Sequence, residues 1–248
     1  MSADSTESHL YAGLAAKMRR FARRFGASEL LWKPVRVALS PLVIPFLPER
    51  TFEFKDQTLR CFYHRYNITW AAERGVEIPI AQSYLGARPD ARVLEVGNVL
   101  SHYYPSRHEI VDKFERGPRI INVDIVDYSP PTRYDLILSI STFEHIGFDD
   151  EASGSSGEKI LAALANCRRL LSERGLLVIT VPTGYNPDLD EMIRDGSLGA
   201  SAEHFLCRTG RRQWRPCSKD EALKCRYRRP YPYANGLLVA EFTRARAG

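Results

Sequence analysis

The chain has 248 residues, of which 44% are hydrophobic and 26% are charged, and its formal net charge is +5. This length suits one large domain, or one domain with an N-terminal extension. The apolar fraction is too high for a disordered chain, and 16 glycines and 15 prolines without a period exclude a collagen-like or low-complexity architecture. The small excess of basic residues permits an anionic partner without requiring one.

The N-terminal region contains a basic amphipathic pattern. Between Leu10 and Phe25, apolar residues recur three or four apart, with lysine and arginine between them. Such a helix can lie on an anionic membrane, which would give a weak peripheral contact through residues 10–25. We favour a helix that packs on its own domain and solvates its basic face. Four prolines in residues 28–50 predict an irregular connector, so residues 1–50 are interpreted as an extension and connector.

The cysteines and the apolar segments indicate the cellular compartment of the protein. Five cysteines stand at positions 61, 167, 207, 217 and 225. They are too few and too scattered for a disulfide framework, which indicates a reducing compartment. No stretch approaches the roughly 20 apolar residues of a membrane span, and the N-terminus does not have the pattern of a signal peptide. The sequence therefore predicts a cytoplasmic protein.

Beyond residue 50 the pattern becomes that of a folded domain. Residues 51–62 predict a hairpin or strand, residues 63–75 an aromatic and polar helix or turn, and residues 76–85 an apolar segment. We interpret residues 51–86 as a cap over the substrate and residues 87–248 as the main domain. The expected strands there cover residues 92–96, 109–111, 119–123, 134–140, 176–181, 203–208 and 237–243. The expected helices cover residues 159–171, which Gly175 follows as a stop, 188–194 and 219–226.

Strands that alternate with helices predict an α/β fold with a mostly parallel sheet covered on both faces. Ligands of such sheets bind beyond the carboxyl ends of the strands. Here the first strand of the main domain ends at Gly97, the second at Asp112 and the third at Asp124. A carboxylate after the second strand can accept hydrogen bonds from both ribose hydroxyls, and one after the third strand can accept from an adenine amino group.

The phosphate-binding signals are missing from this arrangement. A dinucleotide fingerprint has three glycines that open a helix, but this chain has Gly97 alone, followed by Asn98 and Val99. A glycine-rich loop with Lys-Ser or Lys-Thr is also absent. The pattern fits a nucleoside that has no phosphate, of which S-adenosylmethionine (SAM) is the common one.

Five motifs in order strengthen this interpretation. They are VLEVG at 93–97, VD at 111–112, NVD at 122–124, YDLILSISTFEHIG at 134–147 and GLLVITVP at 175–182. Together they resemble the class I SAM-dependent methyltransferases. The resemblance implies a Rossmann-like, doubly wound, mostly parallel seven-stranded sheet with helices on both faces and an N-terminal helical cap. Two departures are the single glycine and a first helix that must be short.

The resemblance also implies the residues that hold SAM. Glu95 and Gly97 would line its methionine and ribose side, Asp112 would bind the ribose hydroxyls, and Asp124 would lie near the adenine. The full expected set is Glu95, Gly97, Asn98, Asp112, Asp124, Ile125, Ser139, Ser141 and Thr142.

Catalysis of methyl transfer mainly requires in-line positioning of the acceptor and the methyl donor, and removal of a proton from the acceptor. His145 is the candidate base, because imidazole titrates near neutral pH. The alternative is that His145 anchors the segment after the fourth strand, with Glu144 structural. Polar and aromatic side chains in the cap and in the loop after the fifth strand are the expected acceptor contacts. They are His64, Tyr66, Asn67, Trp70, Tyr185 and Asn186; a packed aromatic helix is the alternative for the first four.

No metal site is expected. The run Asp149-Asp150-Glu151 is typical of a solvated loop, and His204 with Cys207, Cys217 and Cys225 does not have the paired short spacings of a zinc motif. The expected reaction is O-methylation of a small molecule or of a sugar or glycan. One alternative is an RNA methyltransferase, because residues 208–229 contain nine basic and two acidic residues, although no RNA-binding module or base-methylating motif supports a nucleic-acid partner. Another is a non-catalytic SAM-binding scaffold or regulatory subunit.

Overall fold

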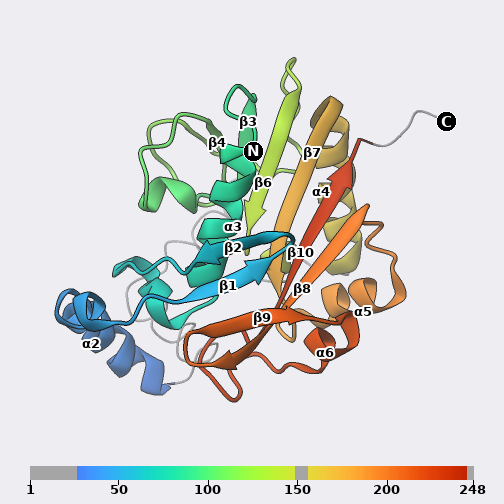
Figure 1. Cartoon of the computed structure of the whole chain (residues 1–248). Helices are drawn as coiled ribbons and strands as arrows, with labels where there is room; N and C mark the ends of the chain where they lie inside the picture. Colours follow the sequence, from blue (N-terminus) through green and yellow to red (C-terminus); the bar gives the residue numbers. More distant parts are fainter. Residues whose placement is uncertain (1–26, 149–155, 245–248) are drawn as a thin grey trace, which may run out of the picture.

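The computed structural model of the chain describes residues 27–148 and 156–244 (Figure 1). The amphipathic segment at residues 10–25 and the acidic run at 149–151 lie outside the described residues. The core is one eight-stranded sheet in the order β5-β4-β3-β6-β7-β10-β8-β9. Its strands are β3 (Val93–Val96), β4 (Glu109–Val111), β5 (Ile120–Ile121), β6 (Tyr134–Ile140), β7 (Leu171–Pro182), β8 (Ala202–Gly210), β9 (Gln213–Cys217) and β10 (Gly236–Thr243).

The strand directions confirm the doubly wound arrangement. β3 pairs in parallel with both β4 and β6, while β10 runs antiparallel to its neighbours β7 and β8. The chain leaves β3 for β4 and β5 on one side and then crosses to β6 and β7 on the other. The strand order therefore reverses between β3 and β6, which is where open α/β sheets bind ligands. The eighth strand, β9, was not predicted; it pairs with β8 at the sheet edge.

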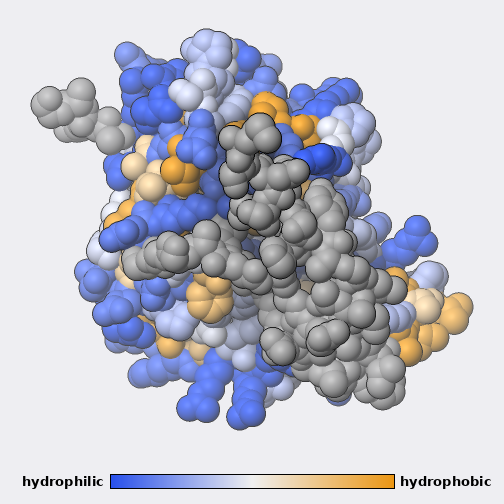
Figure 2. Space-filling model, turned by 180° about the vertical axis from the view of Figure 1, so that it is seen from behind, coloured by the Kyte–Doolittle hydropathy of each residue, from blue (hydrophilic) through white to orange (hydrophobic). Residues whose placement is uncertain are grey.

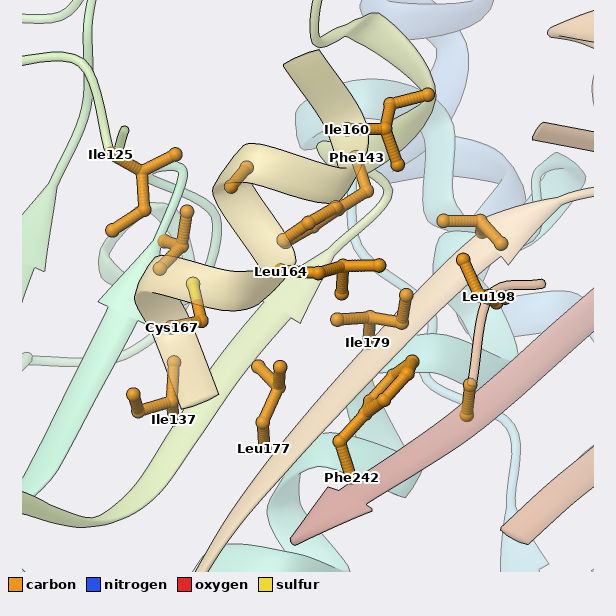
Figure 3. Packing of buried hydrophobic residues seen from close by; sticks show 14 of the residues in the cluster. Ile125, Ile137, Phe143, Ile160, Leu164, Cys167, Leu177, Ile179, Leu198 and Phe242 are labelled. Atoms are coloured by element: carbon orange, nitrogen blue, oxygen red, sulfur yellow. The ribbon is translucent and has the colours of Figure 1, made fainter. Parts of the chain in front are cut away.

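Helices cover both faces of the sheet (Figure 1). The helices are α2 (Ala27–Val43), α3 (Arg74–Gly86), α4 (Ser156–Leu170), α5 (Pro187–Asp195) and α6 (Lys219–Lys224), and a hairpin joins β1 (Thr51–Phe54) to β2 (Gln57–Arg60). Alternate residues of β6 serve the two faces, so Ile137 packs with α4 while Leu136 and Leu138 pack with α3 and the hairpin. Figure 3 shows the first of these clusters, with Leu164 and Cys167 of α4 over Ile137, Leu177 and Ile179 of the strands.

Two local predictions differ from the structure, and the helix or turn predicted over residues 63–75 is present as a short turn. Residues 27–43, expected as part of an irregular connector, form α2 in spite of Pro34 and Pro41. Gly175 does not stop the preceding helix, because α4 ends at Leu170 and Gly175 lies within β7. The aromatic segment at 63–75 contains the short 3-10 turn η3 (Tyr66–Ala71), which is kinked where Asn67 and Ile68 adopt left-handed backbone angles.

The helix α2 and the turn after it, η2 (Ile44–Phe46), leave apolar side chains on the surface. Val35, Val37, Leu39, Leu42 and Phe46 are all exposed. In the back view of Figure 2, the coloured side chains are mostly hydrophilic, and one of several apolar groups lies at the edge where α2 lies. None of the helices within the described ranges is long and apolar enough to span a bilayer.

One disulfide joins Cys207 of β8 to Cys217 of β9, with a Cα–Cα distance of 5.8 Å. The sequence analysis predicts no disulfide framework, and this single bond was not predicted. The reason is the unpredicted strand β9, whose pairing with β8 brings together two cysteines ten residues apart.

Candidate functional site

The turn after β3 is built around Gly97. Its φ of +86° is a conformation that favours glycine, and its amide donates to Val111 O at 2.8 Å. A Cβ at this position would lie 2.2 Å from Thr142 Oγ1, so the turn also needs glycine to let Thr142 approach. The end of β3 is thereby packed directly against the segment that follows β6.

The next three amides of this turn also donate inside the protein. Asn98 N donates to Asp112 Oδ2 at 2.9 Å. Val99 N and Leu100 N donate to Glu95 Oε1 at 2.8 and 2.7 Å. Phosphate groups bind at turns of this kind through free backbone amides. The four amides of residues 97–100 are committed elsewhere, so this turn offers a phosphate no backbone donor.

Glu95 shapes this turn from beneath. The side chain is fully buried, and its second oxygen, Oε2, lies 2.8 Å from His108 Nε2. The predicted short first helix is the single 3-10 turn η4 (Leu100–His102), which these contacts hold in place.

Acidic side chains surround the same turn. Asp112 follows β4 directly, and its Oδ1 accepts from the amides of Phe114 and Glu115 at 2.8 and 2.7 Å. Glu115 Oε2 accepts from Asn98 Nδ2 at 2.6 Å. Asp112 Oδ2 holds one hydrogen bond, and a carboxylate oxygen can accept two. This edge of the sheet is therefore rich in hydrogen-bond acceptors and negative charge.

Ile125 and Asp124, the two predicted residues that follow β5, contact other parts of the protein. Ile125 is buried in the apolar cluster beneath α4. Asp124 lies 2.9 Å from Lys159 Nζ and 3.2 Å from Lys113 Nζ. Burial acts to raise the pKa of Asp124, but these two ammonium groups outweigh it and hold the pKa below its usual value. Its carboxylate thus has partners of its own.

The end of β6 forms the floor of the site. Ser139 Oγ donates to Val96 O at 2.9 Å and ties β6 to β3. Ser141 Oγ donates to Glu77 Oε1 at 2.6 Å, and Thr142 Oγ1 donates to Ile140 O. The three hydroxyl residues named in the sequence analysis therefore fix the backbone beside Gly97.

A buried charged cluster lies beneath this floor and was not predicted. Glu77 of α3 is fully buried and also accepts from Thr180 Oγ1 at 2.7 Å and from Arg74 Nη1 at 2.8 Å. Burial tends to lower the pKa of Arg74, but Glu77, Glu73 and Glu144 outweigh it, so the guanidinium stays charged. The signal in the sequence is a glutamate inside an otherwise apolar helix.

Glu144 is a buried carboxyl of the same cluster, and its Oε2 has no hydrogen-bond partner among the described residues. Burial raises the pKa of Glu144 well above its usual range, and the carboxylate of Glu77 adds to the effect. A carboxyl whose pKa is raised by folding stabilises the protein in its protonated form. That contribution is present at low pH and is lost as the pH rises through the raised pKa.

We therefore expect Glu144→Gln to become more stable relative to the unmodified protein as the pH rises above about 4.5, the ordinary value. Urea unfolding of both proteins across pH 4 to 9 measures the difference. Glu191→Gln, at an exposed position of α5, is the control. A difference between Glu144→Gln and the unmodified protein that is independent of pH would contradict the assignment.

Aromatic rings surround the predicted base, His145, and the predicted acceptor contact Tyr185. His145 belongs to the 3-10 turn η5 (Phe143–His145), its side chain is 39% exposed, and its Nε2 lies 3.6 Å from Glu144 Oε1. The ring of Tyr185 makes edge contacts with His145, at 5.1 Å between centroids, and with Tyr227, at 5.0 Å. Phe148 contacts Tyr185 as well. Tyr227 was not predicted, because only the fold brings residues 185 and 227 together.

The predicted cap residues separate into two groups. Tyr66 stacks on His102 at 4.4 Å between centroids, and Tyr103 contacts both Tyr66 and His64. These rings lie over η4 and hence beside the turn after β3. Trp70 lies apart from them, because its indole N–H donates to Ser40 Oγ of α2 at 3.1 Å.

The last two predicted residues of the acceptor side have clear local roles. Asn67 adopts a positive φ of 49° in the kink of η3. Asn186 is buried at the N-cap of α5, where its Oδ1 accepts from the amides of Asp188 and Leu189. Its Nδ2 donates to Glu144 O at 3.0 Å, so it anchors α5 against η5.

The basic stretch at 208–229 is partly internal. Arg208 is buried and donates to the carbonyls of Pro232 and Ala71 at 2.7 and 3.0 Å. Arg215 forms an ion pair with Glu221. These two arginines therefore fasten loops and strands together.

No family model and no curated protein match the chain. The N-methyltransferase NodS from Bradyrhizobium japonicum, solved with S-adenosylhomocysteine, is 17% identical over 68% of this chain and 86% of its own, with a TM-score of 0.41. A possible histamine N-methyltransferase from Thermotoga maritima is 12% identical over 69% and 90%, with the same score. The sugar N-methyltransferase KedS8 from Streptoalloteichus is 14% identical over 80% and 99%, with a score of 0.35.

Proposed function

We propose that this chain is a SAM-dependent methyltransferase of the Rossmann-like class I family, with SAM at the carboxyl ends of β3, β4 and β6. The observation that carries the proposal is the turn after β3, whose four amides are internally bonded and whose rim is acidic. A dinucleotide would bring phosphates to carboxylates and find no free amide there. A nucleoside with ribose hydroxyls and cationic groups would find acceptors and negative charge.

The chain's own residues suit such a ligand. Asp112 Oδ2, which holds one hydrogen bond, would accept from the ribose hydroxyls. Glu95 would act through the turn that it shapes, because both its oxygens already have partners. Ser139, Ser141 and Thr142 would support the floor. SAM supplies a methyl group already activated on a sulfonium, so the protein has to position the acceptor and take its proton.

We further propose a small-molecule or sugar acceptor that is methylated on oxygen. The aromatic rings of Tyr185 and Tyr227 would pack against its apolar face, and the cap rings of His64 and Tyr66 would close the other side. His145, whose side chain is partly exposed, would take the hydroxyl proton. The experiment is incubation with SAM and a panel of alcohols, phenols, sugars and amines, read out as methylated product by mass spectrometry.

A methylated product from hydroxyl acceptors would support the whole proposal. A product from amines alone would support methyltransferase activity but contradict methylation on oxygen. SAM binding without transfer to any acceptor would instead favour the scaffold interpretation.

Asp112 offers a sharper test of where the ligand lies. We expect Asp112→Ala to weaken S-adenosylhomocysteine binding roughly 10- to 150-fold, which corresponds to the 1.5–3 kcal/mol of a hydrogen bond to a charged group. Asp127→Ala, which removes an exposed carboxylate outside the expected site, should leave the affinity unchanged. Since Asp112 also accepts three backbone amides, thermal melting of both variants checks that the fold is retained. Equal affinity of the two variants would remove Asp112 from the site.

A further inference from the structure

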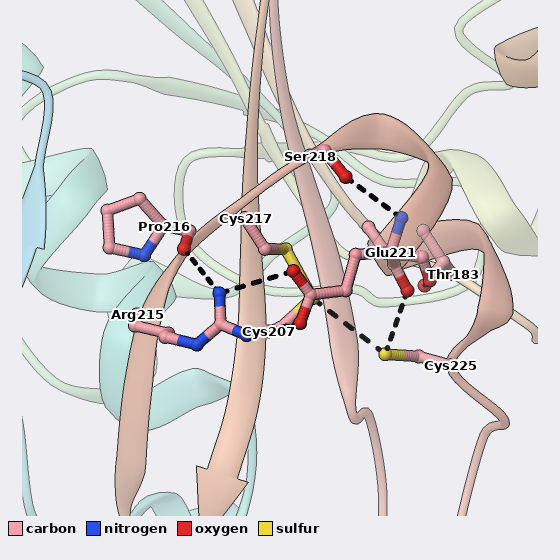
Figure 4. Close-up of a disulfide and its surroundings, with 9 residues drawn as sticks. Thr183, Cys207, Arg215, Pro216, Cys217, Ser218, Glu221 and Cys225 are labelled. Carbon is pink, nitrogen blue, oxygen red and sulfur yellow. Dashed lines mark hydrogen bonds and ion pairs between the residues drawn. A yellow bond between two sulfur atoms is a disulfide. The ribbon is translucent and has the colours of Figure 1, made fainter.

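Three cysteines and one glutamate converge where β8, β9 and α6 meet (Figure 4). The donor atoms of Cys207, Cys217 and Glu221 all lie within 4.8 Å of one another. Cys225, which follows α6, places its Sγ 3.9 Å from Cys207 Sγ. Cys207, Cys217 and Glu221 come from three separate elements, and Cys225 follows the third, so the fold brings the cluster together.

We propose that the reduced form of this cluster binds one thiophilic divalent cation through Cys207, Cys217, Cys225 and Glu221, and that Zn²⁺ is the best match. Three sulfurs and one carboxylate oxygen are a donor set that zinc accepts in four-coordinate sites. With zinc–sulfur bonds of about 2.3 Å, two ligands of a tetrahedral site lie roughly 3.8 Å apart. The spacing of Cys207 and Cys225 is 3.9 Å.

The disulfide and the cation-bound state exclude each other. A dithiol reductant supplies two electrons and two protons, is itself oxidised to a disulfide, and converts the Cys207–Cys217 bond into two thiols. Binding of the cation then displaces the protons of three thiols, which leave to solvent as three S–metal bonds form. The cluster therefore has an oxidised cross-linked state and a reduced metal-bound state.

The surroundings of the cluster support a bound ion. Arg215 Nη1 donates to Glu221 Oε2 at 3.2 Å, which would fix the carboxylate from outside and offset the negative charge of three thiolates. Ser218 Oγ accepts from Glu221 N at 3.2 Å and fixes the first turn of α6. A groove of about 610 Å³ reaches Glu221 and Cys225, and four basic residues also line it, Arg208, Lys224, Arg226 and Arg229, so the cluster's own anionic ligands have to attract the ion.

The cation would also fasten one wall of the acceptor side. A Cβ at Gly184 would lie 2.8 Å from Cys225 O and 2.9 Å from Tyr227 N, so this segment packs tightly on the loop after β7. Tyr227 in turn contacts Tyr185. Binding at Cys225 would clamp the β8–β9 hairpin to the segment that carries Tyr227.

The test uses the full chain, reduced with a phosphine, freed of metal and titrated anaerobically with Co²⁺ as a spectroscopic probe and with Zn²⁺ as a competitor. We expect one equivalent of Co²⁺, the sulfur-to-cobalt charge-transfer absorption of a thiolate site, and displacement by one equivalent of Zn²⁺. Cys225→Ala should weaken Co²⁺ binding at least about tenfold, while Cys61→Ala, outside the cluster, should not change it.

Alkylation followed by mass spectrometry gives a readout that needs no variant. Bound Zn²⁺ should protect Cys207, Cys217 and Cys225 but leave the labelling of Cys61 unchanged. Absence of the charge-transfer band in the reduced protein would overturn the proposal. Equal loss of affinity in Cys61→Ala and Cys225→Ala, or labelling that Zn²⁺ does not alter, would overturn it as well.

Discussion

Replacing His145 with alanine is expected to lower the turnover number about 10²- to 10⁴-fold, the usual contribution of a general base. The ring of Tyr185 packs against the imidazole, with 5.1 Å between the ring centroids, and Glu144 Oε1 lies 3.6 Å from its Nε2. Its side chain is partly exposed, so an acceptor can reach it and its loss creates no buried cavity. The measurement is steady-state kinetics with the best acceptor from the panel.

The same variant separates catalysis from binding. S-adenosylhomocysteine affinity and melting temperature should stay unchanged, because His145 is proposed to contact the acceptor and not the cofactor. Tyr185→Phe, which keeps the aromatic ring, is the matched control and should retain most of the turnover. Full activity of His145→Ala would leave His145 as a structural anchor of η5, which is the alternative that the sequence leaves open.

Gly97→Ala is expected to destabilise the protein by about 2–5 kcal/mol and to abolish cofactor binding. The positive φ costs about 1–2 kcal/mol for a residue with a Cβ. Overpacking adds about 1–3 kcal/mol, because the new carbon would lie 2.2 Å from Thr142 Oγ1. Urea unfolding gives the stability, and titration with S-adenosylhomocysteine gives the affinity.

Substitutions at two other glycines measure the conformational cost and the overpacking cost separately. Gly196 has a φ of +80°, but a Cβ there would meet no atom within 4 Å, so Gly196→Ala should show the conformational cost alone. Gly86 has open space and no positive φ, so Gly86→Ala should be neutral or slightly stabilising. If Gly97→Ala costs no more than Gly196→Ala, the close approach of Thr142 to Gly97 is not important for the turn.

The sequence predicts most of the sheet because its strands are short apolar runs bounded by polar residues. Tyr134–Ile140 matches β6 at both ends, and the alternation of strands and helices leads to the observed switch point. Prediction from the sequence fails where tertiary packing overrides local preference. Pro34 and Pro41 would normally interrupt a helix, and β9 is a polar edge strand whose pairing with β8 has no local signal.

The candidate site also contains some features that local sequence predicts and others that depend on long-range packing. The positions of Gly97 and Asp112 at the carboxyl ends of β3 and β4 could be predicted, because each directly follows a strand. Three sets of contacts depend on partners distant in sequence: those of Asp124 with two lysines, of Asn186 with Glu144 O and of Trp70 with α2. Glu77, Tyr227 and the cysteine cluster depend on long-range packing for the same reason.

Calorimetric titration of the purified chain with S-adenosylhomocysteine, SAM and NADH, side by side, tests the central claim most directly. An acidic rim and a turn with no free amide predict micromolar binding of the two sulfur nucleosides and no binding of NADH. Binding of NADH in preference to both would contradict the proposed site, because its phosphates would then have found donors that the turn after β3 does not offer.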